Sequence, residues 1–362
     1  MDNLTSGVTI SVVMPAYNSE KYIKFAIESI IEQTYTDWEL LIVSEFGSKD
    51  RTEEIIRDFE KQDSRIKVLQ NDVKLGLAES LNKGFREAKG KYIARMDSDD
   101  ISHKTRFEKQ LKFMEENPNL IMSGTAQHHF GSFTDRLHTP ACDPKQCKAN
   151  LLFFCDMCHS TVMLRREVFI NNNLFYDKEY GAEDFELWTR AIEVGEIANL
   201  PEVLEEYRVT GETITDDKRD ELQLESGEIV LKAAKNILGV ETNESDAILF
   251  GSWRNSYWRD CDGEERNKRF KRLEEILRMI YENNRIYKKF DEEALLKAIQ
   301  AKWCWAKYYV PMYEIKPVSD IDGVFRKRFT STRLNRVYYF SRDHKGISKK
   351  LKKIYVKLIK KG

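Results

Sequence analysis

Lys91-Tyr92-Ile93-Ala94-Arg95-Met96-Asp97-Ser98-Asp99-Asp100 is the stretch around which the rest of the chain can be arranged. It leans apolar from residue 92 to 96 and then carries three carboxylates within four positions. In extended backbone, side chains at i and i+2 share a face, so Asp97 and Asp99 are expected to point together and Ser98 away from them. Two hard oxygen donors at the carboxyl end of a strand suit Mg²⁺ or Mn²⁺ held against a diphosphate.

The acidic residues allow a second interpretation. Asp100 or Ser102 could cap a helix that begins near His103, which would make the stretch an ordinary loop. Short Asp-x-Asp patterns recur by chance, so the surrounding segments decide between the two.

Upstream of this stretch, apolar runs of strand length alternate with helical stripes. Such alternation predicts an α/β fold with a Rossmann-like, mostly parallel sheet and right-handed crossovers. Ligands of these sheets bind outside the carboxyl ends of the strands, so Tyr17, Glu45 and the Asp97/Asp99 pair should gather on one rim. The expected strands are residues 9–14, 39–43, 66–69 and 91–96, and the expected helices are 19–33, a segment around 55–59, and 77–88.

Pro15-Ala16-Tyr17-Asn18 follows the first strand, where a dinucleotide-binding domain would carry Gly-x-Gly-x-x-Gly. This substitution argues against a nicotinamide or flavin dinucleotide as the ligand.

The length and amino-acid composition of the chain are typical of a soluble protein of two domains. The chain has 362 residues, of which 41% are hydrophobic and 33% charged, and no apolar run is long enough to span a bilayer. Residues 1–7 lack the features of a secretory signal, and six cysteines without such a signal indicate reduced thiols in a cytoplasmic protein.

After Asp99 the regular alternation of strands and helices ends, and from about residue 215 onward helical periodicity and high charge dominate. A helix is expected at 107–117, strands at 120–127 and 160–164, and a long irregular loop at 131–146. Glu183-Asp184 opens an amphipathic helix, and its charges also suit the helix dipole without any catalytic role. Further helices are expected at 222–238, 266–287 and 292–309. The predicted domains are 1–220, a helical region 221–322 and a basic tail 323–362.

The basic tail concentrates positive charge. It carries 14 Lys and Arg against one acidic residue, which leaves 45 basic and 59 acidic residues in the rest of the chain. Apolar residues at 347, 351, 354, 355 and 358 form one helical stripe between lysines, as in helices that bind the anionic inner face of a membrane. The alternatives are a tail packed on the acidic body, or a nucleic-acid partner, for which no stacking module is present.

Several blocks together resemble the family 2 glycosyltransferases, which have the GT-A fold. The likeness covers residues 8–215 in order, and nothing beyond about residue 220 contributes to it. Its blocks are Val12-Val13-Met14-Pro15-Ala16-Tyr17-Asn18, residues 33–43, the stretch 94–100, His159-Ser160-Thr161-Val162-Met163, Glu183-Asp184-Phe185-Glu186-Leu187-Trp188 and Glu206-Tyr207-Arg208.

The resemblance implies a GT-A catalytic domain that moves a sugar, with inversion, from a nucleotide diphosphate donor, usually a UDP-sugar, to an acceptor hydroxyl. The acceptor would be a glycan or a lipid-linked glycan in surface polysaccharide or glycoconjugate synthesis, and the transferred group a hexose or an N-acetylhexosamine. Asp99 and Asp97 would bind Mn²⁺ or Mg²⁺, and Asp184 would be the catalytic base, assisted by Glu183. The expected contacts of the nucleotide sugar are Pro15, Ala16, Tyr17, Glu45, Arg95, Asp97, Ser98 and His159.

Two positions depart from the family pattern. Glu45 stands where members usually have an Asp that binds the uracil N3–H, in a turn that is one residue longer than usual. Thr210 stands where a His commonly reaches the metal or the diphosphate. These departures favour a second hypothesis, a GT-A-like binding protein that has lost catalysis and acts through its basic tail. Retention of Asp97, Asp99 and Asp184 opposes it.

Cys155-Asp156-Met157-Cys158-His159 matches the pattern for covalent haem attachment, and Cys142 and Cys147 would complete a set of four zinc ligands. Buried free thiols are the favoured interpretation, because haem attachment belongs outside the cytoplasm and zinc sites need two matched pairs.

Overall fold

The computed structural model describes residues 7–132, 134–210, 219–251 and 262–308. The chain divides into two compact units, one made of Met1–Trp253 with Ile280–Ala298 and the other of Arg254–Met279 with Ile299–Gly362. The predicted basic tail lies outside the described residues, and the domain limits predicted at 220 and 322 stay predictions.

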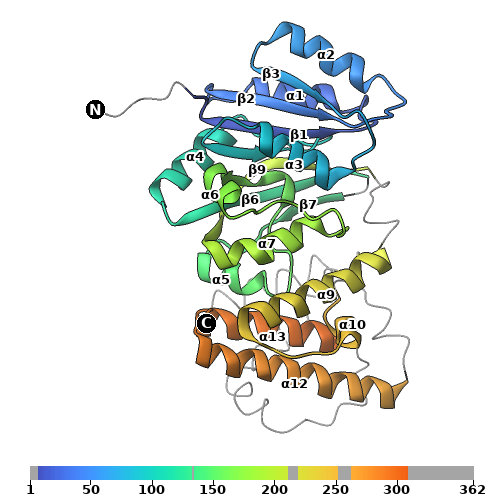
Figure 1. Cartoon of the computed structure of the whole chain (residues 1–362), viewed down its shortest axis with the longest axis vertical. Helices are drawn as coiled ribbons and strands as arrows, with labels where there is room; N and C mark the ends of the chain where they lie inside the picture. The colour runs from blue at the N-terminus through green and yellow to red at the C-terminus, as the bar shows by residue number, and fades with distance from the viewer. Residues whose placement is uncertain (1–6, 133, 211–218, 252–261, 309–362) are drawn as a thin grey trace. The chain divides into compact units, whose positions relative to one another are not determined.

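The amino-terminal half of the first unit is the predicted parallel α/β arrangement (Figure 1). One strand is central and pairs in parallel with two others, and a fourth strand lies outside. In the order of the sheet these strands are β3 (Ile66–Gln70), β2 (Trp38–Ser44), β1 (Ile10–Ala16) and β4 (Tyr92–Arg95), and the helices between them are α1 (Ile23–Ile31), α2 (Thr52–Gln62) and α3 (Leu77–Glu87).

Strand β1 is covered on both faces, which explains its mostly apolar sequence. Ile10, Val12 and Met14 belong to the same buried core as the apolar stripe of α1. Val13 points the other way, toward Gly84 of α3, where an added Cβ would lie 2.3 Å from the Val13 side chain. Alternate residues of one strand therefore anchor helices on opposite sides of the sheet.

Beyond β4 the nine-stranded sheet becomes mixed. Strand β8 (Met163–Arg165) is antiparallel to β4 and β6, β9 runs parallel to β6, and β5 is antiparallel to β9. The other elements of this half are β5 (Ile101–Ser102), α4 (Arg106–Glu116), β6 (Leu120–Gly131), β7 (Thr134–His138), α5 (Pro144–Asn150), α6 (Arg166–Asn171), α7 (Glu183–Val194) and β9 (Glu196–Val209).

Two predicted segments are wrong in part. The strand predicted at 160–164 begins as the 3₁₀ turn η1 (His159–Thr161), because the backbone amide and hydroxyl of Thr161 both donate to the Cys158 carbonyl at 2.9 and 2.8 Å. The loop predicted at 131–146 contains β7 and the start of α5. Asp143 caps α5 by accepting from the Gln146 amide, with Pro144 in the first turn.

The carboxyl-terminal region is helical, as predicted. Its elements are α9 (Arg219–Leu238), η2 (Glu244–Asp246), α10 (Ala247–Phe250), α12 (Gly263–Tyr287) and α13 (Glu292–Tyr308). Within the first unit, α9 packs closely on α10, since a Cβ on Gly227 would lie 1.9 Å from the Ala247 carbonyl oxygen. Among the described residues, no helix combines the length and the apolar character that crossing a membrane requires.

Candidate active site

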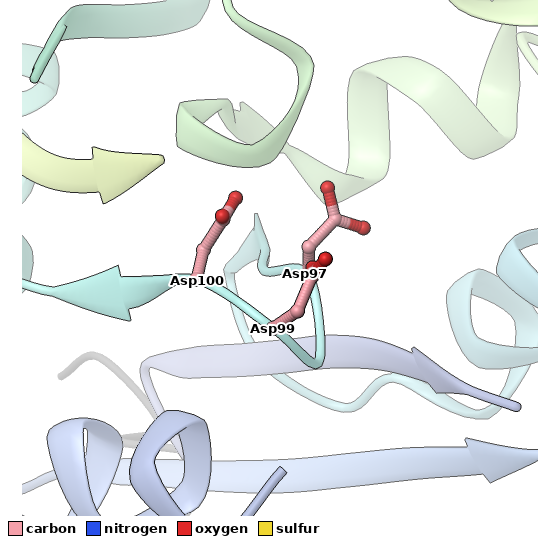
Figure 2. Close-up of side chains that lie close together, drawn as sticks. All are labelled: Asp97, Asp99 and Asp100. Atoms are coloured by element: carbon pink, nitrogen blue, oxygen red, sulfur yellow. The ribbon is translucent and has the colours of Figure 1, made fainter. Parts of the chain in front are cut away.

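Three carboxylates project from the turn that follows β4. Strand β4 ends at Arg95, so Asp97, Asp99 and Asp100 lie in a turn rather than in extended backbone. Each offers an oxygen atom, and these atoms lie within 4.8 Å of one another, on the same side of the turn (Figure 2). The predicted meeting of Asp97 and Asp99 is confirmed, but the strand geometry given as its reason is wrong, and Asp100 joins them.

The chain holds the turn through contacts on each of its residues. Asp97 accepts a hydrogen bond from Arg95, whose side chain is only 3% exposed. Ser98 is buried, and its hydroxyl lies 2.8 Å from that of Ser19, away from the carboxylates as predicted. Arg95, predicted as a contact of the nucleotide sugar, is thus a buried residue that bonds to Asp97.

Asp100 does not cap a helix. The helix after it, α4, begins only at Arg106, and Asp100 Oδ1 instead accepts from the backbone amide of Arg208 at 2.8 Å. The Arg208 side chain donates to the carbonyl of Asp99 at 2.8 Å, so β9 fixes this turn at two points. Arg208 was part of a family block, but its position on the acidic turn was not predicted.

The acidic cluster fits a divalent cation. Asp100 is fully buried, and its Oδ2 has no hydrogen-bond partner among the described residues. Burial and the charge of Asp97 raise the pKa of Asp99 to about 6, and burial together with Glu205 raises the pKa of Asp100 well above its usual range. Hard oxygen donors that repel one another are the ligand set that Mg²⁺ and Mn²⁺ prefer.

Glu183 and Asp184 open helix α7, as predicted. Asp184 Oδ1 accepts from the Phe185 amide at 2.7 Å, and Oδ2 accepts from the thiol of Cys155 at 3.4 Å. Burial raises the pKa of both carboxyl groups, and the charges of Asp184 and Asp97 raise that of Glu183 further. The charge of Asp97 adds to the raised pKa of Glu183, so the α7 pair lies within electrostatic range of the acidic turn.

His159 lies beside this pair in an aromatic cluster. Its Nε2 is 2.9 Å from the Tyr176 hydroxyl, its Nδ1 is 3.8 Å from Glu183 Oε1, and its ring packs edge-on against Trp188. Burial, with Arg95 adding to it, lowers the pKa of His159 well below its usual range. His159 is therefore a neutral imidazole next to the α7 pair.

The residues predicted to contact the nucleoside lie at the ends of β1 and β2 and in the turns that follow these strands. Tyr17 is 42% exposed, with the Lys74 ammonium 5.7 Å from its ring centre, whereas Ala16 is buried. Glu45 is also buried and accepts backbone hydrogen bonds from Leu75 at 3.0 Å and Gly76 at 2.5 Å. A contact between Glu45 and a nucleobase N3–H would compete with these bonds.

Two features of the site were not predicted. Cys155 is a free thiol, as the favoured interpretation predicted, but it is exposed rather than buried, and its contact with the candidate base was not predicted. The carboxylate of Glu225 binds the backbone just before Glu183, and no local sequence signal marks that contact. Thr210, at the position where the family commonly has a His, lies next to Ser132, whose hydroxyl donates to the Thr210 carbonyl at 3.0 Å.

Comparison with known proteins finds a family model and several relatives that are all glycosyltransferases. The family model described as Glycosyl transferase family 2 matches residues 11–172. An uncharacterized glycosyltransferase of Haemophilus influenzae is 33% identical over 219 residues, which cover 56% of this chain and 66% of that protein. Escherichia coli WfgD, named UDP-Glc:alpha-D-GlcNAc-diphosphoundecaprenol beta-1,3-glucosyltransferase, is 32% identical over 217 residues, which cover 59% of this chain and 82% of WfgD.

Among solved structures, S. aureus TarS in complex with UDP-GlcNAc superposes with a TM-score of 0.58 at 17% identity, over 83% of this chain and 91% of that one. This similarity supports the GT-A-like architecture followed by helices. Together with the family model and the curated relatives, it shows that the chain belongs to glycosyl transferase family 2 and is a glycosyltransferase.

Proposed function

We propose that the protein transfers a sugar, with inversion at the anomeric carbon, from a UDP-sugar to a hydroxyl of a glycan or lipid-linked acceptor. The observation that carries the proposal is the acidic turn of Asp97, Asp99 and Asp100 in electrostatic contact with the Glu183–Asp184 pair. One set of carboxylates suits the donor diphosphate and its metal, and the other suits the acceptor hydroxyl.

The nucleoside would lie on the rim formed by the turns after β1 and β2. Tyr17 offers an exposed aromatic face for stacking, and Pro15 and Ala16 are the last residues of β1 before this turn. Glu45 would shape this pocket by holding the loop at Leu75 and Gly76. Two relatives support a uridine donor, since WfgD is named as acting on UDP-Glc and TarS was solved with UDP-GlcNAc.

A divalent cation, Mn²⁺ or Mg²⁺, would be held by Asp99 and Asp97, with Asp100 completing the cluster, and would neutralise charge on the diphosphate. Arg95, which is buried, would keep the partly exposed Asp97 oriented through their ion pair. Ser98 fixes the turn against Ser19 and lies behind the carboxylates. A structure of Pyrobaculum calidifontis PcManGT with GDP-Man and Mn²⁺ has the same kind of fold, with a TM-score of 0.50 at 15% identity.

Asp184 would accept the proton of the acceptor hydroxyl as the new glycosidic bond forms. Its Oδ1 is held by the Phe185 amide, which leaves Oδ2, the oxygen next to Cys155, for the proton. Glu183 and the neutral His159, which lie next to each other, would contact the donor sugar or orient the catalytic base Asp184.

A lipid-linked acceptor would place the reaction at the cytoplasmic face of the membrane. The name of WfgD includes a diphosphoundecaprenol acceptor, and the 32% identity over 82% of WfgD supports a role for this chain in surface polysaccharide synthesis. The basic tail, with its excess of 13 positive charges, would then hold the protein on the anionic inner leaflet, at about 1 kcal/mol for each basic residue near the surface.

Two experiments test the proposal. Incubation with Mn²⁺, a panel of UDP-hexoses and UDP-N-acetylhexosamines, and undecaprenyl-diphosphate-linked sugars should release UDP and give a product whose anomeric configuration is opposite to that of the donor. The absence of release with every donor would favour a binding protein that has lost catalysis. Full-length protein should sediment with anionic vesicles and a variant lacking residues 346–362 should not, whereas equal sedimentation would exclude the tail as the anchor.

A further inference from the structure

The start of helix α7 depends on a side chain from α9. Ala182, which precedes the helix, makes no side-chain capping bond of its own. The backbone amides of Gly181 and Ala182 instead donate to the two carboxylate oxygens of Glu225, at 2.9 and 2.6 Å. One half-buried carboxylate from the helical region thus binds both amides that come directly before Glu183 and Asp184.

A second contact from the same face of α9 reaches the first turn of α7. Lys232 follows Glu225 by seven residues, two helical turns, and therefore lies on the same face. Its ammonium is 3.3 Å from Glu186 Oε1 and 3.2 Å from the Tyr180 hydroxyl. Glu225 and Lys232 therefore hold the backbone before the base and the helical turn after it.

The two segments approach closely at Gly181, where an added side chain would meet side chains of α9. A Cβ added there would lie 2.8 Å from Leu222 Cδ2 and 3.4 Å from Glu225 Oε2. The glycine therefore allows α9 to reach the peptide backbone itself. A larger residue at this position would require the Leu222 side chain to shift.

We infer that Glu225 is a positioning residue for sugar transfer. It fixes the peptide from which Glu183 and Asp184 project, so the helical region takes part in aligning the base although it lies beyond the segment matched by the family model. The inference rests on the proposed role of Asp184. Misplacement of a catalytic group by about 1 Å can cost a factor of about 100 in rate, so two hydrogen bonds at this point matter for turnover.

The first test compares Glu225→Ala and Glu225→Gln with wild type. Loss of hydrogen bonds to a charged group should lower kcat roughly ten- to a hundredfold in Glu225→Ala. Glu225→Gln keeps one acceptor oxygen and should retain more activity. KM for the UDP-sugar and the affinity for UDP with Mn²⁺ should stay at wild-type values, because Glu225 does not act on the donor. Glu228→Ala, which removes an exposed charge from the same helix, is the matched control and should leave kcat unchanged.

The second test measures the contact between Glu225 and the backbone by a method that does not depend on enzyme activity. Hydrogen exchange of the Gly181 and Ala182 amides should be about tenfold faster or more in Glu225→Ala, because each amide loses its acceptor. Unchanged exchange would overturn the inference, as would faster exchange with wild-type kcat, or a loss of UDP affinity that matches the loss of kcat. If wild-type protein transfers no sugar from any donor, the proposed function fails, and the exchange result separately decides whether Glu225 holds this backbone.

Discussion

Arg106 and Glu205 form an ion pair with an Nη1–Oε2 distance of 3.1 Å, and neither side chain is exposed to solvent. Arg106 also donates to the Arg95 carbonyl at 2.7 Å, and Glu205 accepts from Gln127 at 2.7 Å and from Ser160. This network lies below the acidic turn and joins α4, β4, β6 and β9. These buried polar side chains support the acidic turn.

Arg106→Met should lower the free energy of unfolding by about 3–5 kcal/mol, because it leaves the Glu205 carboxylate buried without its partner. Chemical denaturation measures the change. Lys109→Met is the matched control: Lys109 pairs with Glu202 on the surface, where both side chains are 40% or more exposed, and the expected loss is about 1 kcal/mol or less. An equal loss of unfolding free energy in the two variants would show that the buried pair stabilises the fold no more than a surface pair does.

Asp99→Ala should remove the dependence of UDP binding on Mn²⁺, because it deletes a central oxygen donor of the cluster. Titration calorimetry with UDP, in the presence and absence of Mn²⁺, measures this dependence. Ser98→Ala is the matched control in the same turn, since its hydroxyl bonds to Ser19 and not to the carboxylates. Asp100→Ala should be milder than Asp99→Ala for metal binding. Identical UDP affinities in wild type and Asp99→Ala, each with and without Mn²⁺, would contradict the metal site.

Glu45→Gln should weaken the binding of UDP, CDP and GDP by similar factors. The reason is that the Glu45 carboxylate holds the Leu75 and Gly76 amides, and an amide side chain can replace only part of that contact. Competition binding with the three nucleotides gives the ratios of affinity. A loss confined to UDP would show instead that Glu45 reads the uracil N3–H, as the family pattern implies for this position.

The parallel half of the fold could be predicted because each of its strands is a local apolar run. β1 and β2 are buried on both faces, so their sequences show the pattern without help from the rest of the chain. Strand β7 has no such signal: its residues are mostly exposed and polar, and within the described part of the chain it pairs with β6 alone. A polar strand at the sheet edge forms through its partner's backbone, which its own sequence does not reveal.

The site could be predicted where family blocks carried it and not where distant segments meet. Asp97 and Asp99 stand in one such block and lie together with Asp100 in the structure, and Glu183 and Asp184 stand in another block at the start of α7. The contact of Glu225 with Gly181 joins residues 44 positions apart, and that of Arg208 with Asp100 joins residues 108 positions apart. Both use a charged side chain on backbone groups, so neither residue type nor spacing indicates the partner.

Asp184→Asn should lower kcat by roughly 10²–10⁴-fold, the usual contribution of a positioned base, while the KM for the donor changes little. The variant keeps the shape of the side chain and its bond from the Phe185 amide, and it removes only the proton acceptor. Initial rates at saturating donor measure the change. Normal turnover at saturation together with lost donor binding would assign Asp184 to the donor instead.

The pH dependence of kcat should report the state of Asp184. A base works only when it is deprotonated, and burial raises the pKa of this carboxyl, so the rate should fall as the pH drops through a value above the usual range of aspartate. The hydrogen bond from the Cys155 thiol lowers the same pKa, because it favours the ionised carboxylate. Cys155→Ala should therefore move the acid limb of the profile to higher pH.

Cys155→Ser provides the opposite arm of this test, because a hydroxyl is a stronger donor than a thiol and should move the acid limb to lower pH. Cys155 is exposed, so neither substitution empties the core, and Cys142→Ala serves as a control thiol that does not contact Asp184 in the described part of the chain. Shifts of opposite sign in the two Cys155 variants would identify Asp184 as the group that titrates in kcat. Profiles that coincide with wild type in both variants would mean that a different group controls the rate.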